Sequence, residues 1–392
     1  MNNIQKIYLL TFLGNITIFA SISVPFFLEW GKINFTELFL VEMVFVGTLA
    51  LAQVPTGAFA DKYGRKISMI VGVLLGIVSL FVLVSTPNVW IFALAEFIGG
   101  LGAAFTQGAD DALVYDTLKE EKREKTAKSV FANKNIASSL GLILGAPIGT
   151  IIAGASILPA PENYRMVFLL TVIPATLTLL VAFTLRERKH AKKVETEALL
   201  HTSLKGLKDV VKNPKVLAMA LDWSIVAGMG FFMFWLYQPL LKESGVDITY
   251  WGFVSAGYNT FAMVLLAKIG WIDKKLGTRT VLLGSAIAIG TGYLGAMLTR
   301  NPLVIVPVIF IVAGLNVART PLFTQVINEQ LPSERRATGM STVGMFRDVM
   351  RFLLYPIIGF VTDISLNLSF LLLGGTILIV VGLLQFFEWK NK

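Results

Sequence analysis

The 392-residue chain contains no cysteine and only two histidines, and only 15% of its residues are charged. Without cysteine, the chain has no disulfide and no thiolate metal site. His190 and His201 fall in the same polar stretch, which favours solvated loop side chains over metal ligands or a proton relay. We therefore expect neither a metal nor a cofactor. A soluble domain has roughly 25% charged residues, so the low charge excludes an ordinary soluble fold.

Hydrophobic residues make up 55% of the chain. They fall in blocks of about 20 or more, the length at which a helix crosses a bilayer. We predict an all-α membrane protein with 12 transmembrane helices. Residues 1–6 lack the pattern of a cleavable signal peptide, so the first block is expected to be a span. The expected spans lie at about 5–28, 36–60, 67–86, 89–112, 129–153, 164–185, 216–240, 250–272, 280–299, 303–326, 338–361 and 367–388.

The positive charges are distributed unequally between alternate loops. Of the 34 Lys and Arg residues, 25 fall at the termini and in the loops on one side, four in the opposite loops and five within spans. By the positive-inside rule this places both termini in the cytoplasm. The net charge of +9 is thereby explained as a signal for orientation, and we expect no binding to nucleic acid. We predict a multi-pass protein of the cell membrane, in a prokaryote the inner membrane.

The longest loop on the cytoplasmic side divides the chain into two bundles of six helices. We predict an N-terminal bundle over 1–185, a linker over 186–215 and a C-terminal bundle over 216–392. Apolar residues of the linker recur at helical spacing between 199 and 211, with lysines on another face, which predicts an amphipathic helix on the inner leaflet. A regulatory, lipid-binding role and a plain connection between the bundles are both open.

Landmarks recur in the two halves. A signature turn (residues 57–66, Gly57-Ala-Phe-Ala-Asp61-Lys-Tyr-Gly64-Arg-Lys) follows the second span, and Asp273-Lys-Lys-Leu-Gly277-Thr-Arg279 follows the eighth. Gly145-Ala-Pro147-Ile-Gly149 in the fifth span is echoed 209 residues later by Pro356-Ile-Ile-Gly359. Such a duplication predicts two pseudo-symmetric bundles with a transport site between them.

Each position of the signature turn has a physical use. Gly57 permits close approach of another helix. Asp61 can cap the next helix or face the positive end of a helix. Gly64 permits a turn that a β-carbon resists. Arg65 needs an anionic partner, and Asp116 after the fourth span supplies one.

The signature turn resembles the motif of the major facilitator superfamily between its second and third helices. The resemblance implies alternating access, with a cytoplasmic latch in which Gly57 and Asp61 meet the start of helix eleven near residues 337–340. A purely topogenic role explains the basic residues of the turn but not Asp61 or the glycine spacing. The predicted gate residues are Gly57, Asp61, Lys62, Gly64, Arg65, Asp116, Asp273 and Arg279.

Two positions depart from the drug–proton antiporters of that family. Those proteins usually carry an arginine in helix four, where this chain has Glu96 before its glycine run. Their helix-five motif is matched only in part by Gly141-x-x-x-Gly145-Ala-Pro-Ile-Gly149. The glycines of the fifth span therefore also fit a role in close packing alone.

Ionisable residues within spans are costly and indicate function. Glu42 and Glu96 lie in the outer halves of their spans, and with Asp222 they are the predicted proton-coupling residues. Near the cytoplasmic ends of their spans lie Asp110, Asp111, Lys134, Asp222 and Lys268, for which snorkelling or salt bridges between helices are a sufficient explanation.

The eleventh span carries a charged stripe. Arg347 and Arg351 share a face, which favours either an anion-attracting patch or salt bridges with Asp222 or Asp348. Polar and aromatic side chains complete the expected substrate cavity, although an aromatic residue in one helix is more often in packing. The predicted cavity residues are Asn15, Gln107, Trp235, Gln238, Tyr258, Asn316, Arg319, Arg347 and Asp348.

The chain shows no nucleophile motif and no phosphate-binding loop, so we predict a secondary active transporter and not an enzyme. Its expected partners are a small-molecule substrate, protons and the bilayer, and we expect a monomer. The first functional hypothesis is proton-coupled export of small amphipathic compounds. The alternative is proton-coupled uptake or exchange of an anionic metabolite. A sensor or lipid-handling protein with the same fold is disfavoured because it needs no alternating gate.

Overall fold

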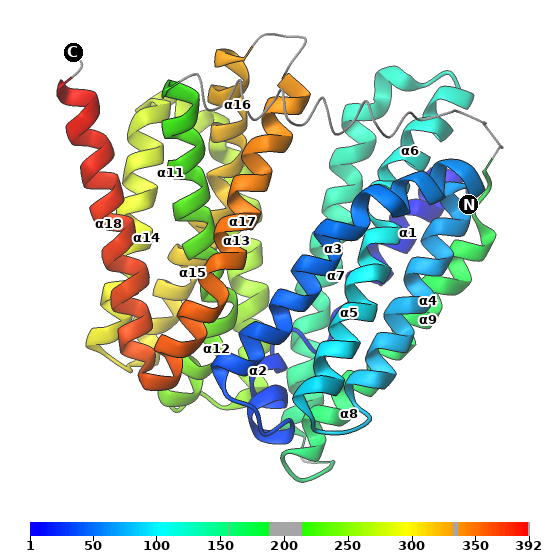
Figure 1. Cartoon of the computed structure of the whole chain (residues 1–392), viewed down its shortest axis with the longest axis horizontal. Coiled ribbons are helices and arrows are strands. Elements are labelled where there is room, and N and C mark those ends of the chain that lie inside the picture. Colours follow the sequence, from blue (N-terminus) through cyan, green and yellow to red (C-terminus); the bar gives the residue numbers. More distant parts are fainter. Residues whose placement is uncertain (156, 188–213, 332–335, 391–392) are drawn as a thin grey trace. The chain divides into compact units, whose positions relative to one another are not determined.

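The computed structural model describes the chain apart from residues 156, 188–213, 332–335 and 391–392. The described residues form helices joined by short turns, and no strand occurs among them (Figure 1). The amphipathic helix predicted between residues 199 and 211 lies outside the described residues.

Contacts between residues divide the described chain into two compact units. The elements of the first unit are α1 (Asn3–Gly14), α2 (Ser23–Pro25), the π-helical turn η1 (Phe26–Trp30), α3 (Phe35–Tyr63), α4 (Arg65–Leu83), α5 (Val89–Thr106), α6 (Ala109–Glu120), the 3₁₀ turn η2 (Glu124–Thr126), α7 (Ala127–Gly154), α8 (Glu162–Leu170) and α9 (Val172–Thr184). This unit also includes Ile248–Ala256, at the start of α13. The second unit contains α11 (Pro214–Phe231), α12 (Met233–Glu243), the rest of α13 (Ile248–Leu276), α14 (Thr278–Leu298), α15 (Pro302–Ala318), α16 (Thr320–Gln330), α17 (Arg336–Ile364) and α18 (Leu366–Lys390).

Ten helical segments among the described residues are long and apolar enough to cross a membrane. They correspond to ten of the twelve expected spans. The expected first span is not a continuous helix, because α1 is only 12 residues long and the chain leaves the helix after Gly14. The expected eleventh span is the 29-residue helix α17, whose middle carries the charges of Arg347, Asp348 and Arg351.

Four of the expected spans are interrupted at related places in the two halves. The first breaks after Gly14 and the fourth at Gln107–Gly108, between α5 and α6. The seventh breaks at Phe232, between α11 and α12, and the tenth at Arg319, between α15 and α16. These are the first and fourth spans of each half, and a further break at Thr171 separates α8 from α9. Discontinuous helices at membrane depth are typical of transporter binding regions.

The break in the first span is matched by a stripe of glycines on α7. A β-carbon at Gly141 would lie 2.5 Å from the Phe12 carbonyl oxygen, and one at Gly145 would lie 2.9 Å from the Thr17 amide nitrogen. A β-carbon at Gly149 would overlap the carbonyl oxygen of Ile18. The glycines of the fifth span therefore allow α7 to contact the end of α1 and the non-helical backbone that follows it, as close-packing residues do.

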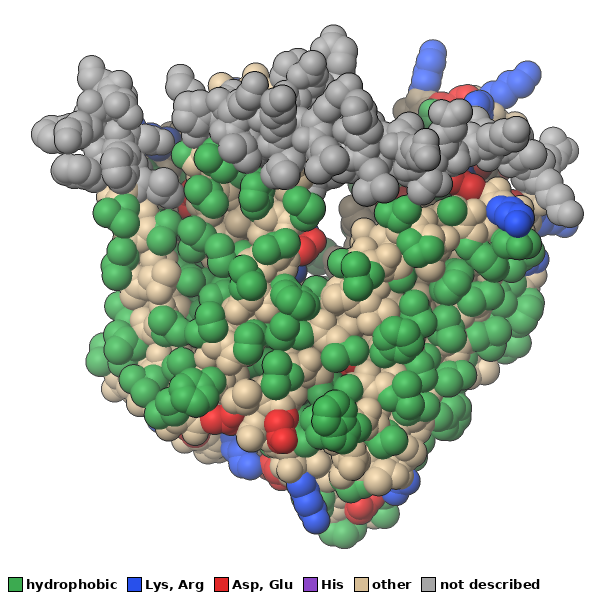
Figure 2. All heavy atoms as spheres, viewed as in Figure 1, with side chains coloured by type: hydrophobic (Ala, Val, Ile, Leu, Met, Phe, Trp, Pro, Cys, Tyr) green, Lys and Arg blue, Asp and Glu red, His purple; other side chains and the backbone are tan. Residues whose placement is uncertain are grey.

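The surface has the polarity that a bilayer requires. Figure 2 shows hydrophobic side chains over most of the visible face, with the described charged side chains mainly towards the ends of the helices. Exposed large apolar residues such as Leu74, Phe81, Ile173 and Phe183 belong to helices that the sequence predicts to span the membrane.

We expect Gly149→Ala to destabilise the protein by about 1–3 kcal/mol, because the added methyl group overlaps backbone that has little room to move. The matched control is Gly76→Ala in α4, where a β-carbon meets nothing within 4 Å. That change should leave stability within about 0.5 kcal/mol or raise it slightly through helix propensity. Melting temperatures in detergent check both variants, and equal melting would contradict the packing role of the stripe.

Candidate functional site

The signature turn is a tight reversal between α3 and α4. Gly64 has φ +108°, and Gly277, in the matching turn between α13 and α14, has φ +82°. Side chains on L-residues resist such angles, so both turns favour glycine. Gly64 therefore has the turn conformation expected of it, its role in the gate stays a prediction, and the two turns share one backbone form.

Arg65 begins α4 and its guanidinium forms an ion pair with Asp116 on α6. The same Nη1 atom donates a hydrogen bond to the Ala112 carbonyl oxygen. The ion pair that the sequence predicts is therefore present. It joins the end of the signature turn to the second half of the interrupted fourth span.

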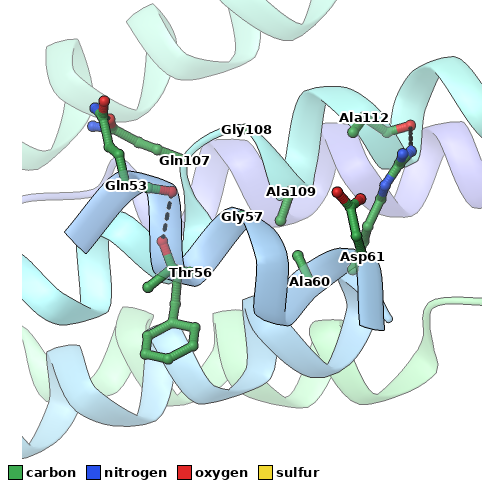
Figure 3. Close-up of a pocket in the computed structure, with 11 residues that line it drawn as sticks. Gln53, Thr56, Gly57, Ala60, Asp61, Gln107, Gly108, Ala109 and Ala112 are labelled. Carbon is green, nitrogen blue, oxygen red and sulfur yellow. Dashed lines mark hydrogen bonds between the residues drawn. The ribbon is translucent and has the colours of Figure 1, made fainter. Parts of the chain in front are cut away.

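A cavity of about 450 Å³ lies beside the signature turn, between α3 and the junction of α5 with α6. Figure 3 shows Gln53 and Gln107 near one end of this cavity and Asp61 and Ala112 near the other. Gln53 Nε2 donates to Gln107 Oε1 over 3.3 Å. Thr56 holds α3 against α5, since its hydroxyl lies 3.0 Å from the Ala104 carbonyl oxygen. Gln107 thus belongs to this cavity, as well as to the break in its own span.

Two residues of the signature turn, Gly57 and Asp61, lie differently from the predicted arrangement. Gly57 faces the cavity, and a β-carbon there would meet no described atom within 4 Å. Close packing of a second helix at Gly57 therefore stays a prediction. Asp61 lies in the last turn of α3 and does not cap α4. It lines the cavity, and its carboxylate has no hydrogen bond or ion pair with any described residue. Lys62 is exposed, and its Nζ atom makes a cation–π contact, 5.0 Å from the centroid of the Tyr63 ring.

The cap of α4 comes from a residue that sequence reasoning missed. The Glu187 carboxylate accepts hydrogen bonds from the backbone N–H groups of Arg65, at 2.7 Å, and Lys66, at 2.8 Å. The Lys66 ammonium donates to the Phe183 carbonyl oxygen at the end of α9. A carboxylate at a helix N-terminus satisfies free donors and complements the helix dipole. No local pattern indicates this contact, because 122 residues separate Glu187 from Arg65.

The two acids predicted for the outer halves of their spans are neighbours. Glu42 on α3 interacts electrostatically with Glu96 on α5. Both side chains are half-buried. The structure therefore brings together two carboxyl groups that are 54 residues apart in the sequence.

A buried lysine accounts for the acids that follow the break in the fourth span. Lys134 on α7 pairs with both Asp110 and Asp111 in the first turn of α6. The lysine side chain is 10% exposed, whereas that of Asp111 is 60% exposed. These three residues form salt bridges between helices, one of the two explanations that the sequence allowed.

The second unit pairs its charges unevenly. Arg319, at the break in the tenth span, lies 3.4 Å from Asp222 on α11 and is almost completely buried. Its Nε and Nη1 atoms have no hydrogen-bond partner among the described residues. Arg347 holds Asp348, its chain neighbour, at 3.1 Å. Asp222 therefore has Arg319 as an ion-pair partner.

The remaining predicted cavity residues lie mostly inside their units. Asn15 ends α1, and its amide donates to the Thr11 carbonyl oxygen. Asn316 donates to the Ala227 carbonyl oxygen over 3.4 Å. Three other predicted cavity residues are buried in the second unit: Trp235, Gln238 and Tyr258. In the second signature turn, Asp273 lies in the last turn of α13 and Arg279 in the first turn of α14. Their proposed roles in gating and binding stay predictions.

A family model described as "Major Facilitator Superfamily" matches residues 7–355. The gentisate transporter of Corynebacterium glutamicum is 24% identical over 322 residues, covering 80% of this chain and 69% of that protein. Multidrug resistance protein 2 of Bacillus subtilis is 23% identical over 359 residues, covering 88% and 86%.

Solved structures show the same architecture. The crystal structure of the nucleoside transporter NupG superposes with a TM-score of 0.82 at 14% identity, covering 98% of each chain. A D-xylose–proton symporter superposes with a TM-score of 0.71 at 14% identity, covering 98% of this chain and 97% of that one. At such identities the likeness concerns the fold alone.

We expect Glu187→Ala to destabilise the N-terminal unit by about 1–2 kcal/mol, because two amides and the positive end of α4 lose their carboxylate. Glu187→Gln, which keeps an acceptor oxygen without the charge, should fall between the alanine variant and the parent. Amide hydrogen exchange should accelerate at Arg65 and Lys66 in the alanine variant.

The control is Glu121→Ala, which removes a carboxylate that pairs with exposed Arg123. Exposed ion pairs contribute little, so its melting temperature in detergent should stay close to that of the parent. If Glu187→Ala also melts with the parent and its exchange is unchanged, Glu187 does not hold the signature turn.

Proposed function

Because this chain belongs to the Major Facilitator Superfamily, we propose that it is a secondary active transporter that couples proton movement to the export of small amphipathic compounds. The observation that carries the proton coupling is the carboxyl pair formed by Glu42 and Glu96. Transport itself follows from the family, whereas coupling, direction and substrate are the parts that we propose.

Two neighbouring carboxyl groups at bilayer depth are suited to carry a proton. Like charges that share a site of low dielectric constant disfavour the state in which both are ionised. One proton shared by Glu42 and Glu96 removes that repulsion, and its release restores it. Ionisable residues in membrane spans commonly form such relays. The pair belongs to α3 and α5, so a change in the contact between these helices alters proton binding.

Export of amphipathic compounds is supported by composition and by one relative. Aromatic side chains line the broken seventh span, and a relative that covers 88% of this chain is named as a multidrug resistance protein. Such surfaces fit apolar rings with a polar end.

The signature turn is the proposed cytoplasmic gate. Arg65 and Asp116 brace the turn against α6, and Glu187 braces it against the end of α9. Asp61 remains in the wall of the cavity as a group with no described partner, ready to meet another helix end. The gate would open and close as transport proceeds. We further propose that the protein lies in the cell membrane as a monomer, with both termini in the cytoplasm.

The second candidate function is proton-coupled uptake or exchange of an anionic metabolite. Arg319 favours it, because a buried guanidinium with two nitrogen atoms that have no hydrogen-bond partner in the described part of the chain attracts an anion. One relative is named as a transporter of gentisate, which is an aromatic carboxylate.

We expect Glu96→Gln to abolish the dependence of transport on a pH gradient in proteoliposomes. One pH unit stores about 1.4 kcal/mol per proton, enough for about tenfold accumulation of substrate at a one-to-one ratio. The parent should approach that ratio with ethidium or benzoate as probe, and the variant should stay near equilibrium. A dye that reports internal pH measures the accompanying proton flux.

Glu42→Gln tests whether the pair acts together, since it should also remove coupling or shift its pH range. Glu29→Gln, at the π-helical turn η1, is the control for loss of an acid outside the pair and should remain coupled. Normal proton-driven accumulation in both pair variants would reject the Glu42–Glu96 pair as the coupling site.

For the gate, we expect Asp61→Asn to reduce the transport rate at least about tenfold without changing the amount of protein inserted. A charge-assisted contact of Asp61 with another helix end would contribute about 1.5–3 kcal/mol to the closed gate, which corresponds to that factor or more. Glu120→Gln removes an exposed acid outside the cavity and should transport normally. Unchanged flux in Asp61→Asn would remove Asp61 from the gate.

A further inference from the structure

The break in the seventh span presents two aromatic rings side by side. Phe231 ends α11 and Phe234 lies in the first turn of α12, with Phe232 at the junction. The rings of Phe231 and Phe234 stack with centroids 6.0 Å apart and planes 20° apart. Both side chains are half-buried, so each ring keeps accessible surface. We call these two rings the aromatic shelf.

The backbone at this break is held by side chains from other helices. The Tyr293 hydroxyl on α14 donates to the Met229 carbonyl oxygen at 2.9 Å. The Asn316 amide on α15 donates to the Ala227 carbonyl oxygen, two residues earlier in α11, over 3.4 Å. The Phe232 N–H also donates to the Met229 carbonyl oxygen, so the backbone beside the break is hydrogen-bonded within the protein, as hydrocarbon surroundings require. The aromatic shelf is therefore held in a fixed place.

Arg351 on α17 lies against the aromatic shelf. Its guanidinium carbon is 4.3 Å from the centroid of the Phe231 ring, a close cation–π contact. Its side chain is 26% exposed, and its Nε atom is buried without a hydrogen-bond partner in the described structure. Asp348 lies 4.0 Å from Nη1, at the limit of an ion pair.

Arg347, on the same face of α17, differs from Arg351 in its hydrogen bonds to Asp348. It donates from Nε and Nη2 to the two carboxylate oxygens of Asp348, at 3.1 and 3.5 Å. Asp348 is therefore mainly engaged by Arg347. Arg351 keeps donors for another anion, directly beside the half-buried rings of the aromatic shelf.

We propose that the aromatic shelf and Arg351 bind a planar aromatic carboxylate, with the ring on Phe231 and Phe234 and the carboxylate on the Arg351 guanidinium. This inference rests on the proposed transport function and specifies its substrate class. A guanidinium fork matches a carboxylate in geometry and charge, while aromatic rings favour offset stacking. Such a compound is both amphipathic and anionic, and it satisfies both halves of the site.

Other ligand classes satisfy only part of the site. An aliphatic acid would occupy the guanidinium but leave the rings without a stacking partner. A neutral aromatic would stack but leave the Arg351 donors unpaired. The charges of Arg347, Asp348 and Arg351 sum to a positive value, which disfavours an organic cation.

The test measures binding to the purified full-length protein by calorimetry in detergent, with three probes: benzoate, cyclohexanecarboxylate and benzyl alcohol. Benzoate should bind at least about tenfold more tightly than either analogue, because each analogue lacks one of the two interactions. Equal affinity for benzoate and cyclohexanecarboxylate would overturn the role of the aromatic shelf.

Three variants assign the affinity to residues. Arg351→Gln should weaken benzoate binding about ten- to hundredfold, through loss of a charge-assisted hydrogen bond. Arg351→Lys keeps the charge without the fork and should recover only part of it. Phe231→Leu should weaken benzoate about three- to tenfold and leave cyclohexanecarboxylate nearly unchanged.

The control variant is Lys268→Gln, which removes an exposed cation from α13 of the same unit. It should bind benzoate as tightly as the parent does. Affinities are compared only between variants whose melting temperatures without ligand equal that of the parent. Benzoate affinity that is unchanged in both Arg351 variants would overturn the proposal.

Transport assays separate this inference from the proposed function. Benzoate binding that depends on Arg351, without movement of benzoate or protons in proteoliposomes, would support the site and reject the transport proposal for this compound. Proton-driven transport of ethidium or benzoate that is indifferent to Arg351 and Phe231 would overturn the site and leave the transport proposal standing.

Discussion

Backbone groups at membrane depth must find hydrogen-bond partners inside the protein, and this constraint shapes the regions in which the helices break. Hydrocarbon offers neither donors nor acceptors, so each interruption of a span requires a specific partner. At the break in the seventh span, the Tyr293 hydroxyl and the Asn316 amide supply donors from α14 and α15. At the end of α1, the Asn15 amide folds back onto its own helix. The breaks are thus fixed structural elements, and they place side chains such as Phe231 and Arg319 where a continuous helix would not.

The same constraint explains the glycines of α7. The non-helical backbone after α1 has polar groups that must not face hydrocarbon, so it has to pack closely against another helix. Gly141, Gly145 and Gly149 recur every four residues on one face of α7, and a β-carbon on any of them would meet that backbone. Small residues in this spacing permit the close approach of backbones in membranes. The glycine pattern that resembles an antiporter motif therefore has a packing role here.

Charges within the spans divide between the two units in a way that suits a transporter. The first unit holds the neighbouring acids Glu42 and Glu96, and it neutralises Lys134 with two aspartates. Within its spans the second unit holds Arg319, Arg347 and Arg351, each over an aromatic ring, and the acids Asp222 and Asp348 beside them. In the proposed function, the acids of the first unit would carry the proton and the arginines of the second would attract an anionic substrate. Alternating access, which the family implies, would let one movement serve both.

The sequence by itself determined the helical membrane class, the family and the repeated turn, since hydrophobic length, charge asymmetry and glycine spacing are local patterns. It also predicted the Arg65–Asp116 ion pair, because helix order placed the two residues at the same end. Ten of the expected spans meet the criteria for crossing, while the continuity of the first span was wrong. Only the tertiary structure decided that Glu187 caps α4, that Glu42 lies beside Glu96 and that Arg351 lies on Phe231. Those contacts join residues 54 to 122 positions apart, and no local periodicity reports which faces of distant helices meet.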